Sequence, residues 1–299
     1  MGTTCRIVLY ARDPRRGGAA AEAAFDRIAA LDASLSDYRP DSELSRLTRG
    51  PVGTPVAVSD DLFRVLDAAQ RMALRSRGAF DITVGPLSQL WRRARRQVAL
   101  PPPGQLEAAR AATGYGLLEL DARRRTATMA APGMRLDAGG IAKGYAADEA
   151  LAVLEGAGLP RALVAVGGDL AVGDAPPGTA GWQVVLAGLE PGQTAPGSPL
   201  ALHRAGVSTS GDAEQWVEID GRRYSHILDP ATGVGMTGRR SVSVVARDAM
   251  TSDMLATALS VMPVADGAAL VEDTAGAAAL VATSAGGAVS WHRSQGWRW

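Results

Sequence analysis

Cysteine is almost absent from the sequence, and the charges of the chain cancel. Cys5 is the one cysteine among 299 residues, which excludes an internal disulfide and a metal site built from several cysteines. The chain has 31 basic and 31 acidic residues, so it has no large electrostatic attraction to nucleic acid or to an anionic membrane. Local arginine clusters, such as residues 92–96, are typical of solvated faces. We therefore expect no nucleic-acid partner.

Long apolar runs are also absent. No run approaches the ~20 residues that a membrane-spanning helix needs. The first residues, MGTTCRIVLYARDPRRG, lack the charged, apolar and small-residue order of a secretory signal. We expect no membrane span in this chain and a cytoplasmic protein, with an exported form that has lost its leader as the alternative.

Lysine occurs once, at Lys143, and every other basic residue is an arginine. Lys143 follows the paired glycines Gly139 and Gly140 in the stretch LDAGGIAKGYAAD, and a helical pattern begins at Ile141. Backbone N–H groups at a helix start are unpaired and carry the positive end of the helix dipole. A phosphate could therefore bind there, beside the compact ammonium of the lysine. The alternative is a simple tight turn with a solvated lysine.

A second candidate element is a helix that we expect to be capped by Thr251 or Ser252 and to run to about Met262. Its apolar side chains form one stripe and leave Asp253 and Thr257 on a neighbouring edge, four residues apart. A carboxylate and a hydroxyl are hard oxygen donors, which suit Mg²⁺. The alternative is an exposed acid near a helix start.

His226 is one of only three histidines and lies in the segment YSHILDP. An imidazole titrates near neutral pH, so His226 is a candidate general base. The alternative is a hydrogen-bonded strand histidine. Ser225 and Asp229 are close in sequence, but closeness along a strand does not establish a Ser–His–Asp triad.

Hairpins outnumber parallel crossovers in the predicted elements. The clearest hairpin has Asp220-Gly221 between two strand-like segments, as a type I′ turn requires. We expect other strands at residues 4–10, 80–84, 162–172, 183–188, 241–246 and 279–293, and helices at residues 19–35, from 60, from 141 and from 253. The helix at 19–35 should carry Phe25, Ile28 and Leu31 or Leu35 on one apolar side. The pattern predicts an α+β fold of antiparallel sheets with packed helices, in one compact unit of two intimate halves over residues 1–299.

Two glycine-rich segments do not match known nucleotide loops. Residues 233–238 have the GxGxxG spacing, but a strand pattern follows where the dinucleotide fingerprint needs a helix. The segment GGIAKG lacks the spacing of a P-loop and the Ser or Thr after its lysine.

Taken together, the motifs resemble the ApbE family of FAD:protein FMN transferases, which are magnesium-dependent enzymes that move FMN from FAD onto a Thr or Ser of a target protein. The matching segments run in family order along nearly the whole chain. They are MGT at Met1, LSDYRPDSELSRL at Leu35, GAFDITVGPL at Gly78, LDAGGIAKGYAAD at Leu136, VGGDLAV at Val166, STSGDAEQW at Ser208, RYSHILDPATG at Arg223 and DMLATAL at Asp253. Thr48 stands where an asparagine is usual in the family.

The resemblance implies a role for each matching residue. His226 would take the proton from the acceptor hydroxyl. Mg²⁺ would be bound by Asp253, Thr257 and the main-chain oxygen of Gly140. FAD would contact Met1, Tyr38, Ala79, Phe80, Asp81, Asp137, Lys143 and the backbone near Ile227. The resemblance also implies the α+β fold, with a T-fold-type duplication.

Three functions are consistent with these motifs. The leading hypothesis is transfer of the FMN moiety of FAD onto a Thr or Ser of an acceptor protein, with release of AMP. The second is a Mg²⁺-dependent FAD pyrophosphatase, in which water replaces the hydroxyl. The third is a non-catalytic protein that binds FAD intact.

Overall fold

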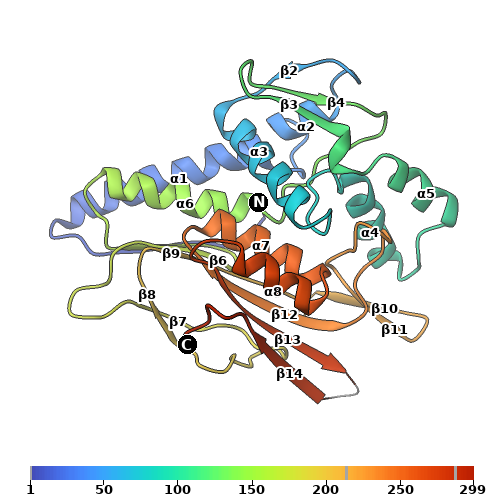
Figure 1. Cartoon of the computed structure of the whole chain (residues 1–299). Helices are drawn as coiled ribbons and strands as arrows, with labels where there is room; N and C mark the ends of the chain where they lie inside the picture. The colour runs from blue at the N-terminus through green and yellow to red at the C-terminus, as the bar shows by residue number, and fades with distance from the viewer. Residues whose placement is uncertain (1, 213–214, 286–287) are drawn as a thin grey trace.

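The computed structural model describes residues 2–212, 215–285 and 288–299. Its centre is a seven-stranded sheet in the order β1-β5-β6-β9-β12-β13-β14 (Figure 1). All neighbours in this sheet are antiparallel. The strands are β1 (Cys5–Leu9), β5 (Ala162–Val166), β6 (Asp169–Val172), β9 (Ala205–Gly211), β12 (Arg239–Ala246), β13 (Ala278–Ala285) and β14 (Ala288–Arg293).

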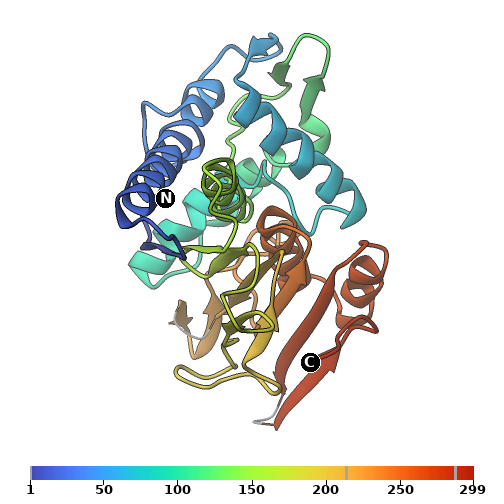
Figure 2. The same ribbon diagram turned by 90° about the vertical axis from the view of Figure 1, so that its left-hand side faces the viewer.

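Alternating side chains of the large sheet face two different hydrophobic cores. On β12, Val242 and Val244 belong to the main core, whereas Val245 packs into a second core on the opposite face. The main core is covered by α6 (Ala142–Gly156) and α7 (Ala249–Val261), with α1 (Pro14–Leu35) packed on α6 (Figures 1 and 2). The second core is covered by the hairpin of β7 (Trp182–Val184) and β8 (Leu200–Leu202) and by Trp297.

Further elements lie beyond α6 and α7, on the side away from the large sheet (Figure 2). They comprise α2 (Glu43–Thr48), α3 (Asp60–Arg75), α4 (Gly85–Gln97), α5 (Pro103–Ala111), the short helix η1 (Tyr115–Leu117) and the small sheet of β2 (Val56–Ala57), β4 (Thr126–Met129) and β3 (Leu118–Asp121). The remaining helix, α8 (Val264–Glu272), follows α7.

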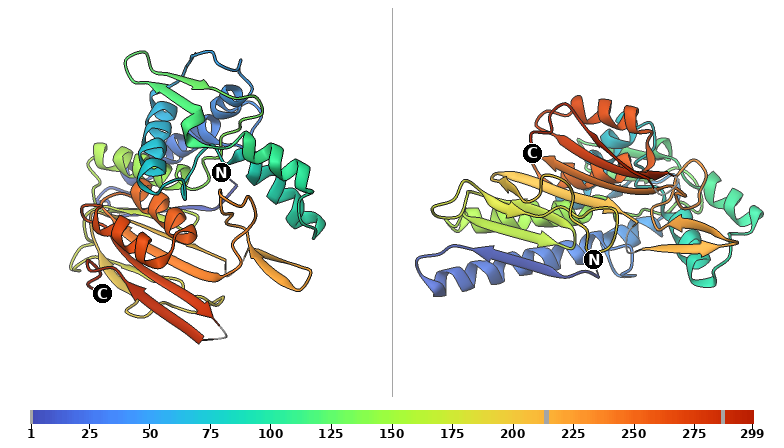
Figure 3. Two further views of the ribbon diagram at one scale, coloured as in Figure 1. Left: turned by 45° about the vertical axis from the view of Figure 1, so that its right-hand side comes forward. Right: turned by 90° about the horizontal axis from the view of Figure 1, so that it is seen from below.

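A separate hairpin, β10 (Trp216–Ile219) and β11 (Arg222–Ser225), lies beside α4 at one end of the molecule (Figures 1 and 3). Trp91 and Ala94 of α4 form a small core with Ile219 and Tyr224 of this hairpin. The hairpin is therefore attached to α4 and brings the segment after β11 to the same place.

The structure confirms the predicted α+β class of antiparallel sheets with packed helices. It also confirms the hairpins, including the turn in which Asp220 has φ 51° and Gly221 has φ 72°. None of the described helices is long and apolar enough to cross a membrane.

Three local predictions are wrong. Residues 80–84 form turns rather than a strand, because Asp81 accepts hydrogen bonds from the backbone N–H and the hydroxyl of Thr83. Phe25 is 42% exposed, since α1 uses small residues such as Ala24 to pack on α6. The N-cap of α7 is Asp248, whose carboxylate accepts from Thr251 N–H.

Candidate active site

Lys143 lies where the start of α6 meets the middle of α7. Its ammonium is 2.7 Å from the carboxylate of Asp169 on β6 and 3.2 Å from both carboxylate oxygens of Asp253 on α7. It also donates to the main-chain oxygen of Gly139 at 3.2 Å. Burial disfavours the charge, but the two carboxylates outweigh it and hold the pKa of Lys143 above its ordinary value. Lys143 is therefore not the freely solvated lysine of the alternative interpretation.

Asp253 is only 2% exposed, so the interpretation as an exposed acid is wrong. The backbone N–H of Gly144 donates to its carboxylate at 3.2 Å. Burial and the charge of Asp169 raise the pKa of Asp253, and the Lys143 ammonium opposes this rise. Two buried carboxylates thus share one lysine, and a site of this composition attracts a further cation.

Asp169 was not identified from the sequence as a site residue. It follows a glycine turn in the segment VGGDLAV. This segment is one of those that match the family, but none of its residues was predicted to bind FAD or metal. A buried aspartate at the first position of a strand, directly after two glycines, is the signal that pointed to it.

Residues on one face of α6, Gly144 and Asp148, allow α6 and α7 to lie close together. A Cβ atom added to Gly144 would overlap the main-chain carbonyl of Ala249, so only glycine lets the two helices approach here. One turn later, Asp148 accepts hydrogen bonds at 2.8 Å from the first two backbone N–H groups of α7, those of Ala249 and Met250. The chain therefore holds α6 and α7 in a defined register, which fixes Lys143 against Asp253.

The predicted metal ligands lie together. A Cβ added to Gly140 would lie 2.7 Å from Thr257 Oγ1 and 3.2 Å from a ring carbon of Phe80, so the hydroxyl faces the glycine backbone. Thr257 is one helical turn after Asp253, on the same face of α7. Its hydroxyl makes no hydrogen bond to any described residue, and so keeps its acceptor capacity. Among the described residues, no group of three or more His, Cys, Asp or Glu side chains could hold a metal.

The segment of Ala79, Phe80 and Asp81 is the turn between α3 and α4. Phe80 is buried in the main core beside Gly140. Burial raises the pKa of Asp81, while its hydrogen bonds from Thr83 work in the opposite direction. The Asp81 carboxylate is therefore turned to Thr83, and the N–H groups of Ala79 and Phe80 already donate to Ser76.

Arg92 of α4 joins two predicted FAD contacts, Tyr38 and Asp137. Its guanidinium lies 4.4 Å from the centre of the Tyr38 ring and donates to Asp137 at 2.9 Å and to Asp37 at 2.6 Å. The other carboxylate oxygen of Asp137 accepts from the backbone N–H of Gly139 at 2.9 Å. The prediction that this arginine cluster is merely solvated is therefore wrong for Arg92. Only the fold reveals its role, because its partners lie far away in the sequence.

His226 follows β11 directly and is partly buried. Its Nδ1 is 3.1 Å from the main-chain oxygen of Gln215, and because a carbonyl only accepts, Nδ1 carries the proton of this hydrogen bond. Burial lowers the pKa of His226, and the charges of Arg95 and Lys143 lower it further. His226 is neutral at pH 7, with Nε2 free of hydrogen bonds to the described residues.

The neighbours of His226 have structural tasks. Ser225 Oγ accepts from the backbone N–H of Ile227 at 3.0 Å, and the main-chain oxygen of Ile227 accepts from Met236 N–H at 2.9 Å. The backbone of Ile227 is therefore already hydrogen-bonded within its own loop. Asp229 Oδ1 accepts from the backbone N–H of Ala231. The structure thus shows no Ser225–His226–Asp229 triad among these described residues.

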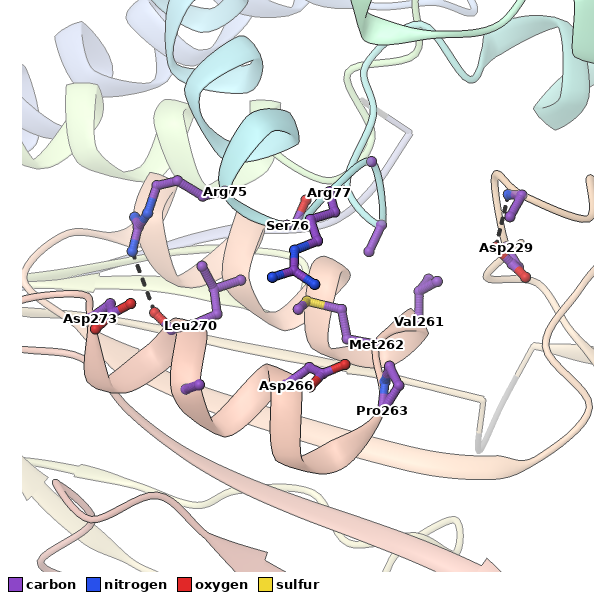
Figure 4. A pocket seen from close by; sticks show the side chains of 14 residues that line it. Arg75, Ser76, Arg77, Asp229, Val261, Met262, Pro263, Asp266, Leu270 and Asp273 are labelled. Atoms are coloured by element: carbon purple, nitrogen blue, oxygen red, sulfur yellow. Dashed lines mark hydrogen bonds between the residues drawn. The ribbon is translucent and has the colours of Figure 1, made fainter.

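A cavity of about 570 Å³ lies between the turn after α3, the end of α7 and α8, and Ala79 is the predicted site residue that lines it (Figure 4). Val261, one turn after Thr257, also lines it. Asp229 approaches it from the loop after β11 (Figure 4). This volume is within the range of small-molecule and cofactor sites. Met1, the remaining predicted FAD contact, lies outside the described residues.

Comparison with known proteins shows the same family along almost the whole chain. The family model described as the ApbE family matches residues 1–281. A protein of Salmonella typhimurium called FAD:protein FMN transferase is 32% identical over 267 residues, which are 88% of this chain and 76% of the relative. A Treponema pallidum protein of the same name is 33% identical over 291 residues, 92% of this chain and 80% of the relative.

Solved structures agree with these matches. The flavin transferase ApbE from Vibrio cholerae superimposes with a TM-score of 0.84 and 30% identity, over 99% of this chain and 94% of the other. The ApbE protein from Thermotoga maritima superimposes with a TM-score of 0.86 and 32% identity, over 98% of this chain and 94% of the other.

Proposed function

Because the chain belongs to the ApbE family, we propose that it is a FAD:protein FMN transferase. It moves the FMN moiety of FAD onto a Thr or Ser hydroxyl of an acceptor protein, depends on Mg²⁺ and releases AMP. The observation that carries this proposal is the contact of Lys143 with Asp253 at 3.2 Å, beside a glycine turn in which Gly140 faces the hydroxyl of Thr257.

The donors at the junction of α6 and α7 fit Mg²⁺. The Asp253 carboxylate, the Thr257 hydroxyl and the main-chain oxygen of Gly140 are all oxygen ligands, which this ion prefers. They supply few ligands of their own, as is usual for a Mg²⁺ that also binds phosphate oxygens of a substrate. When bound, Mg²⁺ would neutralise charge on the pyrophosphate. Lys143 adds a second positive charge at the same place.

His226 supports the proposed reaction through its free Nε2. The hydrogen bond from Nδ1 to Gln215 holds the ring in one tautomer, so Nε2 presents a lone pair. Nε2 accepts the proton of the acceptor hydroxyl as its oxygen attacks the FMN phosphorus. The bond from that phosphorus to the bridging oxygen breaks, and AMP leaves with the electron pair. Such a base typically contributes about 10²–10⁴-fold in rate.

Tyr38 supports binding of a flat ring. Its side chain is 70% exposed, and Arg92 covers one face of the ring at 4.4 Å. The opposite face is suited to stacking on one of the two ring systems of FAD. Arg92 and its two carboxylate partners keep the tyrosine in place before the ligand arrives.

Product analysis separates the proposal from its two rivals. The protein is incubated with FAD and Mg²⁺, with and without a candidate acceptor, and AMP and FMN are quantified by chromatography. Release of AMP only with acceptor supports transfer, whereas AMP and free FMN without acceptor support hydrolysis. Unchanged FAD in both samples supports a binding protein. Activity that is identical with and without a chelator would contradict the Mg²⁺ site.

A further inference from the structure

Arg95 of α4 lies one helical turn after a contact with the segment that precedes the proposed general base. One turn before it, the indole N–H of Trp91 donates to the main-chain oxygen of Ser225 at 3.0 Å. Ser225 directly precedes His226, and Ala94 packs in the same small core as Tyr224. The helix is thus attached to the hairpin, and Arg95, four residues after Trp91, lies on the same face of α4 as this contact.

Arg95 lacks a counter-charge within the described part of the chain. It makes no hydrogen bond or ion pair there, and its Nε is buried without a partner. Arg92, one turn earlier on the same face, is neutralised by Asp37 and Asp137. Because a buried guanidinium N–H without an acceptor is costly, Arg95 is placed to receive an anion from outside the chain.

The position of Arg95 identifies the anion. Arg95 lies one helical turn after Arg92, which covers the ring of Tyr38, and one turn after Trp91, which donates to the carbonyl of Ser225 beside His226. Under the proposed function, a ring of FAD stacks at Tyr38 and the attacked phosphorus lies at His226. FAD has two halves, a flavin ring with a ribityl chain and an adenine ring with a ribose. In each half, the next group along the molecule is a charged phosphate.

We propose that Arg95 binds the pyrophosphate of FAD, through N–H groups that donate to the non-bridging phosphoryl oxygens. The planar fork of arginine matches such oxygens in pairs. Arg95 thereby adds a positive charge on the hairpin side of the pyrophosphate, opposite the Lys143 and Asp253 side. This inference rests on the proposed function, because it assumes that FAD is the ligand.

The test measures equilibrium binding by flavin fluorescence, with Mg²⁺ and without acceptor, in a His226→Ala background that prevents turnover. FAD carries the pyrophosphate, and riboflavin is the probe that lacks it. Arg95→Gln should weaken FAD binding about tenfold to a hundredfold, as expected for hydrogen bonds to a charged group. It should leave riboflavin binding within about twofold. Arg95→Lys, which keeps the charge but loses the fork, should weaken FAD less.

Arg93→Gln is the matched control, because Arg93 is an exposed arginine of the same helix. It should change neither affinity. Equal weakening of FAD and riboflavin by Arg95→Gln would overturn the proposal, since it would indicate a packing effect. Unchanged FAD binding would also overturn it, and a raised KM for the acceptor, measured with Arg95→Gln in the otherwise natural chain, would then assign Arg95 to an acidic group of that protein. A His226→Ala chain that binds no FAD at all would instead contradict the proposed function itself.

Discussion

The single lysine of the chain is explained by the space around it. Lys143 meets two buried carboxylates and a main-chain oxygen, at distances of 2.7 to 3.2 Å. A compact ammonium can donate in three directions from one atom, whereas a planar guanidinium would need a larger space. The residue is therefore both a structural partner of Asp169 and Asp253 and a positive charge near the proposed phosphate site.

Loss of the lysine charge should be costly. In Lys143→Met, the carboxylates of Asp169 and Asp253 face each other without a cation, and breaking a buried ion pair costs about 3–5 kcal/mol. We expect a loss of about that size in the free energy of unfolding, measured by urea denaturation in the presence of a chelator. The double variant with Asp169→Asn should recover part of the loss. Equal losses in both variants would show that the two carboxylates do not repel each other.

The pH dependence of turnover should report His226. The pKa of its imidazole lies below the ordinary value of 6.5, chiefly because of burial, so the base is deprotonated at neutral pH. We expect kcat/KM to be level near pH 7 and to fall as the pH drops through this lowered pKa, because a protonated imidazole cannot accept a proton. His226→Ala should lower kcat/KM by about 10²–10⁴-fold and remove this acid limb.

The control for the histidine prediction is His203→Ala. His203 is exposed and has no role in the proposed mechanism, so its removal should leave the profile unchanged. An acid limb that persists in His226→Ala at the same pH would assign the titration to another group.

At the scale of elements, the contact between α6 and α7 positions the reactive groups. Gly140 and Gly144 permit the close approach, and Asp148 hydrogen-bonds the first turn of α7. These three positions are four residues apart and form one stripe. The stripe lies within the motif that also contains Lys143, so one short segment supplies both the charge and the contact that orients it.

A methyl group at Gly144 should disrupt this contact. The added Cβ would overlap the carbonyl of Ala249, and overpacking of this kind costs about 1–3 kcal/mol. Gly144→Ala should therefore lower the free energy of unfolding by that amount in a denaturant titration. Gly156→Ala, at the end of the same helix and with nothing within 4 Å of the new Cβ, is the matched control and should be neutral or slightly stabilising. Equal effects of the two substitutions would indicate that the helix contact is looser than described.

Asp148 makes the same contact sensitive to pH. Burial raises the pKa of Asp148 from 3.8 to about 7, although two backbone N–H groups oppose the shift. A carboxyl with a raised pKa in the folded state stabilises that state fully below the unfolded value, and this contribution is lost as the pH rises through about 7. The free energy of unfolding of the natural chain should therefore fall relative to that of Asp148→Asn between about pH 4 and pH 7. A constant difference across this range would show that Asp148 titrates normally.

For the whole molecule, the sequence predicted what depends on local patterns. The antiparallel class and the Asp220-Gly221 hairpin follow from alternation and turn chemistry, and both are confirmed. The prediction of a strand at residues 80–84 is wrong. Thr83 is buried together with its apolar neighbours, so the segment has no solvent-exposed face. Thr83 donates to the side chain of Asp81, and this turn takes the place of strand pairing. Apolar alternation alone does not distinguish a half-buried strand from a buried turn.

The candidate site was predicted only in part, because much of it is made by contacts distant in sequence. Lys143 and Asp253 were identified separately, each from its own motif. Arg92 carries no local sign of function, and the only local sign at Asp169 is the glycine turn before it. Their partners are brought to them by the sheet and by α4. Arg92 donates to Asp137 and covers the ring of Tyr38. It could therefore be identified only after the fold was known.

The account depends most on covalent transfer of FMN by the group of residues around Lys143 and His226. Intact-mass spectrometry of a candidate acceptor, after incubation with FAD and Mg²⁺, tests this directly. We predict that the acceptor gains the mass of FMN less one water with the natural chain, and gains it about 10²–10⁴-fold more slowly with His226→Ala under the same conditions. An acceptor that is labelled equally fast by both proteins, or by FAD and Mg²⁺ alone, would contradict the account.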